Sequence, residues 1–197
     1  MNETVIKKES GEIADKYVFG FWLYLMTDLI MFASLFAVFA VLRGATFGGP
    51  AEHQLYDLKN ALAETFILLT SSFMCGLAML AAYRGKKGQA ITAFAATFAL
   101  GASFLGLELR EFYAFAAAGN TPQASASLSA FFTLVGTHGA HIAVGLLWML
   151  VAIAQIQVKG LSPFVVSKLK RLSVFWHFLD LVWIFIFTIV YLMGHML

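Results

Sequence analysis

Long uninterrupted runs of apolar side chains, separated by short polar segments, dominate the chain. Each run is at least as long as the roughly 20 residues that a helix needs to cross the hydrocarbon core of a bilayer. There are five runs, at Phe19–Leu42, Ala61–Tyr83, Ala90–Ala114, Leu128–Ile156 and Leu172–His195. The pattern predicts an all-α membrane protein built as a bundle of five transmembrane helices.

The segments between the runs carry the residues that are typical of turns. They contain Gly48-Gly49-Pro50, the basic stretch from Arg84 to Gly88, the stretch from Gly119 to Pro122, and a last linker that begins near Gly160. Residues 1–18 form a polar tail without the apolar core of a secretory signal or the Arg-rich composition of a transit peptide. We therefore expect one transmembrane domain, residues 19–197, that follows a short cytoplasmic tail.

Composition supports this class of protein. Hydrophobic residues make up 60% of the 197 residues and charged residues only 12%, about half of what soluble domains carry. The net charge of +2 gives no reason to expect nucleic acid as a partner. Cys75 is the single cysteine, so no internal disulfide can form.

The distribution of basic residues predicts the orientation, because Lys and Arg concentrate in cytoplasmic segments. The tail, the second linker and the fourth linker would lie on one side and would hold ten of the thirteen basic residues. These are Lys7, Lys8, Lys16, Arg84, Lys86, Lys87, Lys159, Lys168, Lys170 and Arg171. We expect the N-terminus to be cytoplasmic and the C-terminus to be periplasmic.

Ionisable residues inside the apolar runs are the candidate functional groups. A charged side chain at the centre of a bilayer costs about 2.5–3.5 kcal/mol on insertion scales, so such residues should face the bundle interior and find partners. The set contains four carboxylates and three histidines: Asp28, Glu64, Glu108, Asp180, His138, His141 and His177.

Their depths in the membrane can be estimated from the rise of an α-helix, which is about 1.5 Å per residue. Asp28 would lie roughly 14 Å from the cytoplasmic end of its helix and His138 roughly 15 Å from the outer end of its own, so both come near the midplane and could pair. His141 would lie one turn deeper, level with His177 and Asp180. Glu64 and Glu108 would both lie in the outer part of the membrane.

Three interpretations of these groups are open. His138 or His141 facing His177 would form a bis-histidine haem site, and converging acids and histidines would form an ion pathway. The third interpretation is a set of buried hydrogen-bonded clusters that fix the register of the helices. It is favoured because the acids are split between distant layers and the histidines lack a second matching pair, so we expect neither catalytic residues nor a metal site.

Four segments resemble a known family. They are the run Gly136–Gly145 with its His-Gly-Ala-His core, the run Phe175–Phe187 with Trp-His-Phe-Leu-Asp, the stretch Gly106–Phe112, and the opening Phe19–Asp28. From about Tyr17 to the C-terminus, the chain resembles subunit III of the haem-copper terminal oxidases. The opening and the five-helix length resemble the branch found in bacterial cytochrome o ubiquinol oxidase, whereas longer members carry two additional N-terminal helices.

The resemblance implies an accessory role in a proton-pumping quinol:O2 oxidoreductase of the bacterial inner membrane. The chain would support assembly, lipid binding and sustained turnover without a redox centre of its own, since the haems and copper of the complex belong to subunit I. The implied partners are subunit I, subunit II, a small subunit IV and phospholipids. The alternatives are the same role in a five-helix cytochrome c oxidase and, from a different class, an autonomous cytochrome b or ion carrier.

The resemblance also assigns places to single residues. Asp28 occupies the position of a carbodiimide-reactive family acid, usually Glu, which lies near the histidine that corresponds to His138. Glu111 matches a family Glu at the end of its helix, whereas Glu108 replaces a more usual Gln. Lys170 and Arg171 resemble a site for the headgroup of an anionic lipid.

Overall fold

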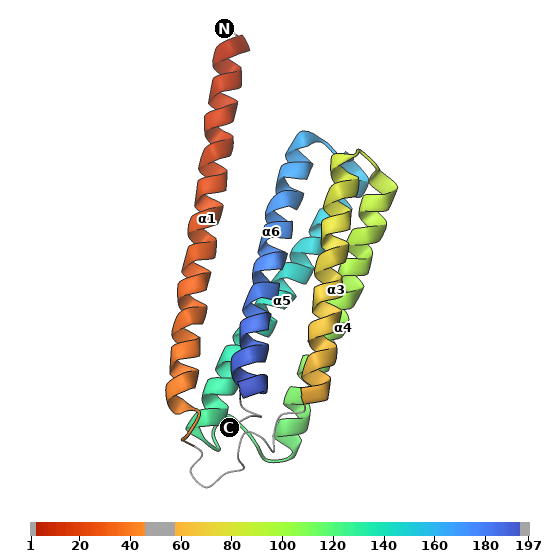
Figure 1. Cartoon of the computed structure of the whole chain (residues 1–197). Helices are drawn as coiled ribbons and strands as arrows, with labels where there is room; N and C mark the ends of the chain where they lie inside the picture. Colours follow the sequence, from red (N-terminus) through yellow and green to blue (C-terminus); the bar gives the residue numbers. More distant parts are fainter. Residues whose placement is uncertain (1–2, 46–57, 194–197) are drawn as a thin grey trace. The chain divides into compact units, whose positions relative to one another are not determined.

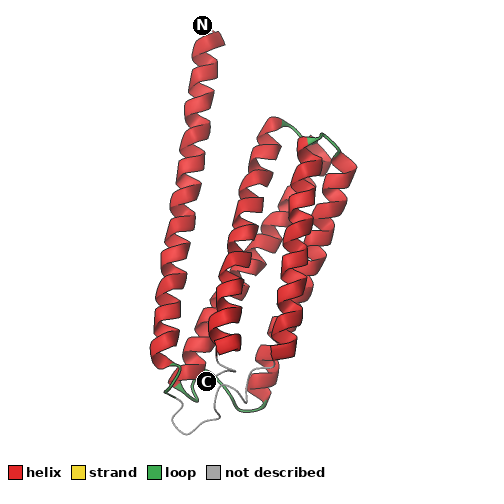
Figure 2. Cartoon of the chain, in the orientation of Figure 1, coloured by secondary structure: helices red, strands yellow, loops and turns green. Residues whose placement is uncertain are grey.

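The computed structural model describes residues 3–45 and 58–193, with side chains from residue 18 onward. All regular structure in these two ranges is helical (Figure 2). Five helices are long and apolar enough to cross a membrane, at Val18–Leu42, Leu58–Tyr83, Lys87–Ala117, Ala126–Lys159 and Pro163–Leu192. The prediction of an all-α fold with five membrane-spanning helices is therefore confirmed.

The chain divides into two compact units, Met1–Ser34 and Leu35–Leu197. The first unit is the greater part of helix α1, Glu3–Leu42. Helical backbone begins fifteen residues before the apolar segment at Val18, so most of the predicted polar tail continues the first membrane helix. The predicted turn at Gly48-Gly49-Pro50 lies outside the described residues.

The second unit contains the remaining helices, and successive helices run in opposite directions (Figure 1). They are α3 (Leu58–Tyr83), α4 (Lys87–Ala117), α5 (Ala126–Lys159), α6 (Pro163–Ile186) and the π-helix η1 (Phe187–Leu192). A π-helix pairs each residue with the fifth residue along instead of the fourth, and most examples are single wide turns inside α-helices. Here it continues α6 directly.

Local sequence explains where these helices begin and end. Gly85, Gly119 and Gly160 each have a φ between 68° and 82°, a conformation that glycine adopts without a steric penalty. Ser125 caps α5 by accepting a hydrogen bond from the Leu128 amide at 3.1 Å, and Ser162 caps α6 in the same way.

The predicted start of the fifth span was wrong by nine residues. Helix α6 begins at Pro163 rather than Leu172, and proline is well suited to the first helical position. Lys168, Lys170 and Arg171 therefore lie on the helix and not in a linker. The predicted end at His195 lies outside the described residues.

Trp176 organises the centre of the second unit. Its ring is completely buried, and its Nε1 donates a hydrogen bond to Ser71 Oγ at 3.2 Å. A Cβ atom at Gly101 would lie 2.7 Å from the indole, and one at Gly145 would lie 3.0 Å from it. Two helices thus approach α6 closely because glycine leaves space for one tryptophan.

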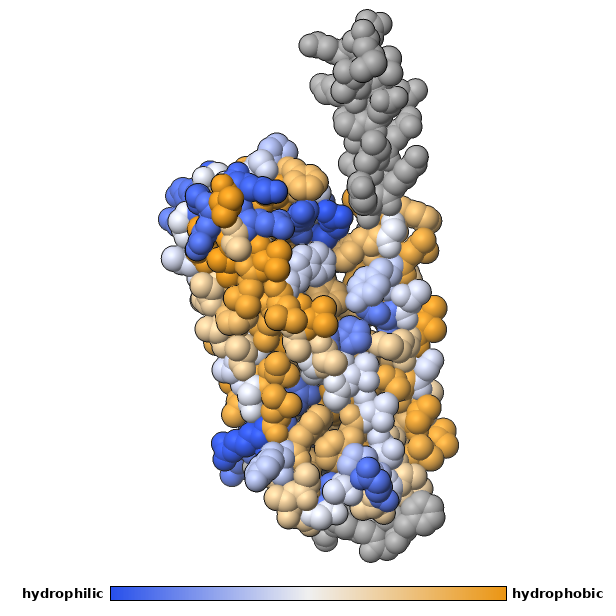
Figure 3. All heavy atoms as spheres, turned by 180° about the vertical axis from the view of Figure 1, so that it is seen from behind, coloured by the Kyte–Doolittle hydropathy of each residue, from blue (hydrophilic) through white to orange (hydrophobic). Residues whose placement is uncertain are grey.

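The face of the second unit that Figure 3 shows is largely apolar in the middle and carries hydrophilic residues toward both ends. We call the end that carries Arg84, Lys86, Lys87, Lys159 and the first two turns of α6 the basic end. The opposite end, where α3 and α5 begin and α4 and α6 finish, carries Glu64, Glu108 and Glu111 and is called the acidic end. The predicted orientation would place the basic end in the cytoplasm.

Candidate functional site

The acidic end brings together three carboxylates from two neighbouring helices. Glu64 lies on α3, and Glu108 and Glu111 lie one turn apart on α4. Glu64 and Glu108 are each only 2% exposed. Among the described residues, no hydrogen-bond donor reaches Glu64 Oε2 or either oxygen of Glu108.

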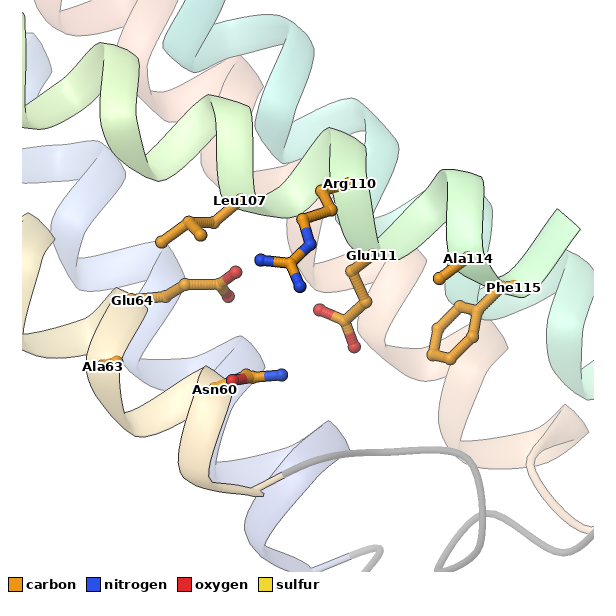
Figure 4. A pocket seen from close by; sticks show the side chains of 8 residues that line it. All are labelled: Asn60, Ala63, Glu64, Leu107, Arg110, Glu111, Ala114 and Phe115. Atoms are coloured by element: carbon orange, nitrogen blue, oxygen red, sulfur yellow. The ribbon is translucent and has the colours of Figure 1, made fainter. Parts of the chain in front are cut away.

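A cavity of about 270 Å³ opens between α3 and α4 beside these acids. Figure 4 shows the carboxyl groups of Glu64 and Glu111 and the guanidinium of Arg110 turned toward the same space. The walls are formed by Asn60, Ala63, Glu64, Leu107, Arg110, Glu111, Ala114 and Phe115. The cavity therefore offers two acids and one base to whatever enters it.

Glu108 packs against α5 and not into the cavity wall. A Cβ atom at Gly139 would lie 2.9 Å from Glu108 Oε2 and 3.0 Å from Oε1. The glycine of the His-Gly-Ala-His motif thus leaves room for this carboxyl. Electrostatic interactions connect Glu108 with Glu64 and Glu111, so the three acids form one cluster of interacting side chains.

His138 lies in an aromatic enclosure. It is fully buried and stacks on Trp183, with ring centroids 5.4 Å apart and planes inclined by 27°. Phe104 meets it edge-on at 6.0 Å, and Trp183 donates from Nε1 to Thr65 Oγ1 at 3.0 Å. The imidazole is held by packing between α4, α5 and α6.

The other two histidines are held by separate hydrogen bonds. His177 Nδ1 lies 2.9 Å from Ser72 Oγ on α3. His141 Nδ1 lies 2.7 Å from the Thr137 carbonyl oxygen of its own helix, which requires that this nitrogen carry the proton, since a carbonyl only accepts. Within the described part of the chain, no group of three or more His, Cys, Asp or Glu side chains is arranged to hold a metal ion.

The remaining predicted residues lie in different places. Asp180 is 7% exposed on α6, and no described residue donates to its Oδ1. Lys170 is exposed and Arg171 half-buried near the basic end. Asp28 belongs to the first unit, where its carboxyl forms a hydrogen bond with Tyr24 one turn earlier. Its pairing with His138 stays a prediction.

Sequence reasoning missed several residues of the acidic end. Arg110 and Asn60 line the cavity, and the Tyr191 hydroxyl donates toward Glu111 Oε2 at 3.5 Å. The spacing of Leu107, Arg110, Glu111 and Ala114 follows one helical face and could have indicated a shared lining. Tyr191 could not have been found this way, because the π-helix changes its direction.

Comparison with known proteins defines the class. A family model described as cytochrome c oxidase subunit III matches residues 2–195. The chain therefore belongs to the cytochrome c oxidase subunit III family, and it is a multi-pass membrane protein. The family resemblance read from the sequence motifs is confirmed.

Three relatives within that family show which oxidase subunits the chain is similar to. A protein named cytochrome bo(3) ubiquinol oxidase subunit 3 from Pseudomonas aeruginosa is 56% identical over 177 residues, or 90% of this chain and 85% of the relative. A protein of the same name from Pseudomonas putida is 49% identical over 186 residues, or 94% and 88%. The cytochrome c oxidase subunit 3 of Bacillus sp. is 44% identical over 177 residues, or 89% and 84%.

Proposed function

We propose that the chain is subunit III of a bacterial haem-copper ubiquinol oxidase. The observation that supports this most directly is its 56% identity, over 90% of its length, to a protein named as that subunit. The complex would oxidise quinol, reduce O2 and translocate protons across the inner membrane. The haems and copper would reside in subunit I, with subunit II and a small subunit IV as the other partners.

The role of this chain would be structural and not redox-active. Hydrogen bonds between side chains tie two helices together: Trp176 to Ser71, His177 to Ser72 and Trp183 to Thr65 all join α6 to α3. Such hydrogen bonds contribute about 0.6 kcal/mol each on average between membrane helices. A rigid bundle of this kind suits a subunit that supports assembly and sustained turnover.

Lys170 and Arg171 belong to this proposal as contacts for anionic lipid headgroups. Both lie on α6 near the basic end, which the predicted orientation places at the cytoplasmic leaflet. The surface of this leaflet is negatively charged, and each basic residue near it contributes about 1 kcal/mol to the attraction between protein and membrane.

A second candidate is the same role in a cytochrome c oxidase. It is supported by the relative of that name at 44% identity, which is lower than the 56% and 49% of the two ubiquinol oxidase subunits. The two candidates differ in the electron donor of the complex.

Purification of the tagged chain from its membrane in mild detergent tests the proposal. A large haem-containing polytopic subunit should purify with it, and the complex should consume O2 with quinol and not with reduced cytochrome c. O2 consumption with reduced cytochrome c would favour the second candidate. A chain that purifies alone and carries stoichiometric haem would reject both.

A further inference from the structure

We propose that the cavity at the acidic end binds the headgroup of an aminophospholipid, with its ammonium between Glu64 and Glu111 and its phosphate on Arg110. This site lies between α3 and α4, at the opposite end of the bundle from Lys170 and Arg171. The inference rests on the membrane location of the chain and not on the identity of its oxidase.

The strongest indication of a ligand is Glu64. The residue is only 2% exposed, and it lines the cavity. Its Oε2 accepts no hydrogen bond from any described residue. A buried carboxylate oxygen without a donor is costly. The carboxyl group is turned toward the open space (Figure 4), so a donor in the cavity would satisfy it.

The combination of charges favours a zwitterion. An ammonium donates three hydrogen bonds and accepts none, which suits two neighbouring carboxylates. A phosphate accepts two parallel hydrogen bonds from the planar guanidinium of an arginine. Asn60 on α3 adds an amide to the lining of the cavity. A bare metal ion fits less well, since no group of three or more acidic, His or Cys side chains among the described residues is arranged to hold one.

The depth and the volume of the cavity suit a lipid headgroup. Asn60 lies two residues from the start of α3, and Phe115 two residues from the end of α4, so the cavity begins about 3 Å from the helix ends. The polar layer of one leaflet is roughly 5–8 Å thick. A volume of about 270 Å³ would hold roughly nine waters, which is about the size of a phosphoethanolamine group.

The two helices that form the cavity also carry exposed apolar side chains. Phe66 on α3 is 68% exposed, and Leu109 and Tyr113 on α4 are 58% and 77% exposed. They belong to the apolar surface that would face the acyl chains of the bilayer. A soluble zwitterion would gain nothing from them.

The test is the retention of lipids by the complex purified after reconstitution with defined mixtures. The mixtures contain phosphatidylethanolamine and phosphatidylcholine with the same acyl chains, so the two lipids differ only in the amine, whose three N–H donors are replaced by methyl groups in choline. Native mass spectrometry counts the bound lipid. We expect the ethanolamine lipid to be retained about tenfold or more in preference to the choline lipid, since charge-assisted hydrogen bonds are lost in the latter.

Three variants locate the site. Glu64→Gln should remove the preference for the ethanolamine lipid, and Arg110→Gln should lower the retention of both lipids, because both carry the phosphate. The matched control is Asp180→Asn, which changes another buried acid with an oxygen that no described residue satisfies but which does not line the cavity. It should keep the preference.

Equal retention of the two lipids by the unmodified complex would overturn the proposal, and this comparison stands even where a variant fails to assemble. An unchanged preference in Glu64→Gln would also overturn it. Displacement of the lipid by soluble phosphoethanolamine at equal concentration would overturn the membrane source of the ligand. Co-purification of a haem-containing subunit is scored separately, so failure of the oxidase assignment would be distinguishable from failure of this site.

Discussion

Substitution of Gly101 by alanine should destabilise the second unit because its new methyl group would collide with Trp176. The added Cβ would lie 2.7 Å from both Cη2 and Cζ2 of the indole and 3.1 Å from Leu146 Cδ2. Trp176 cannot move aside easily, since it is completely buried and its Nε1 is bound to Ser71. Overpacking of a well-packed core typically costs about 1–3 kcal/mol.

The measurement is the thermal unfolding midpoint of the purified protein in detergent. For a chain of this length, 1 kcal/mol shifts the midpoint by roughly 2–4 °C, so the expected loss is about 2–12 °C. Gly106→Ala is the matched control on the same helix, because its Cβ would meet nothing within 4 Å. It should leave the midpoint unchanged or raise it slightly, as alanine favours helix over glycine.

A double-mutant cycle separates this collision from a loss of helix flexibility. Trp176→Phe shortens the ring that the new methyl group would strike, so Gly101→Ala should cost measurably less in that background than alone. Equal midpoints for Gly101→Ala and Gly106→Ala would refute the reasoning. Additive effects of Gly101→Ala and Trp176→Phe would show that the two sites do not interact in the way described.

Further predictions concern topology, Asp28 and cofactors. Reporter fusions after Gly49 and Leu197 should read periplasmic and one after Lys87 cytoplasmic; a cytoplasmic C-terminus would contradict the predicted orientation. Asp28→Asn should keep oxidase assembly and O2 consumption, since the amide can still form hydrogen bonds. Asp28→Leu should weaken the association of the first and fourth spans by about 1–3 kcal/mol, because the predicted contact with His138 would be lost, and subunit retention on purification measures this. Loss of the first turnover in Asp28→Asn with the subunit still bound would make the acid directly catalytic. The isolated subunit should show no stoichiometric Soret band, and its appearance would revive the cytochrome interpretation.

Hydropathy predicted the membrane helices well because the bilayer thickness fixes their minimum length. It failed at the start of α6, where Lys168, Lys170 and Arg171 lower the mean hydropathy although the helix extends beyond the hydrocarbon core. The stop and start signals were nevertheless in the sequence. Ser162 followed by Pro163 is typical of a helix N-terminus.

The candidate site was predictable in its residue types but not in its geometry. The cost of burying charge singled out Glu64, Glu108 and His138 from the sequence alone. Their surroundings depend on how α3, α4, α5 and α6 are rotated against one another. The stacking of His138 on Trp183 therefore became visible only in the structure, as did the cavity itself.

The π-helix at Phe187–Leu192 has a consequence for sequence length in this family. A wide turn inside an α-helix accommodates one residue more than the regular spiral, and removal of one residue would return the segment to α-helical hydrogen bonding. The residues beyond the turn would keep their direction, because the wide turn only absorbs the extra residue. If the segment instead became α-helical without losing a residue, the side chains after the turn would rotate by about 100° around the helix axis, which would turn Tyr191 away from Glu111 and from its ring contact with Trp183. A family member that lacks one residue before this tyrosine should therefore have a regular α-helix here and should still direct the tyrosine toward the same carboxyl group.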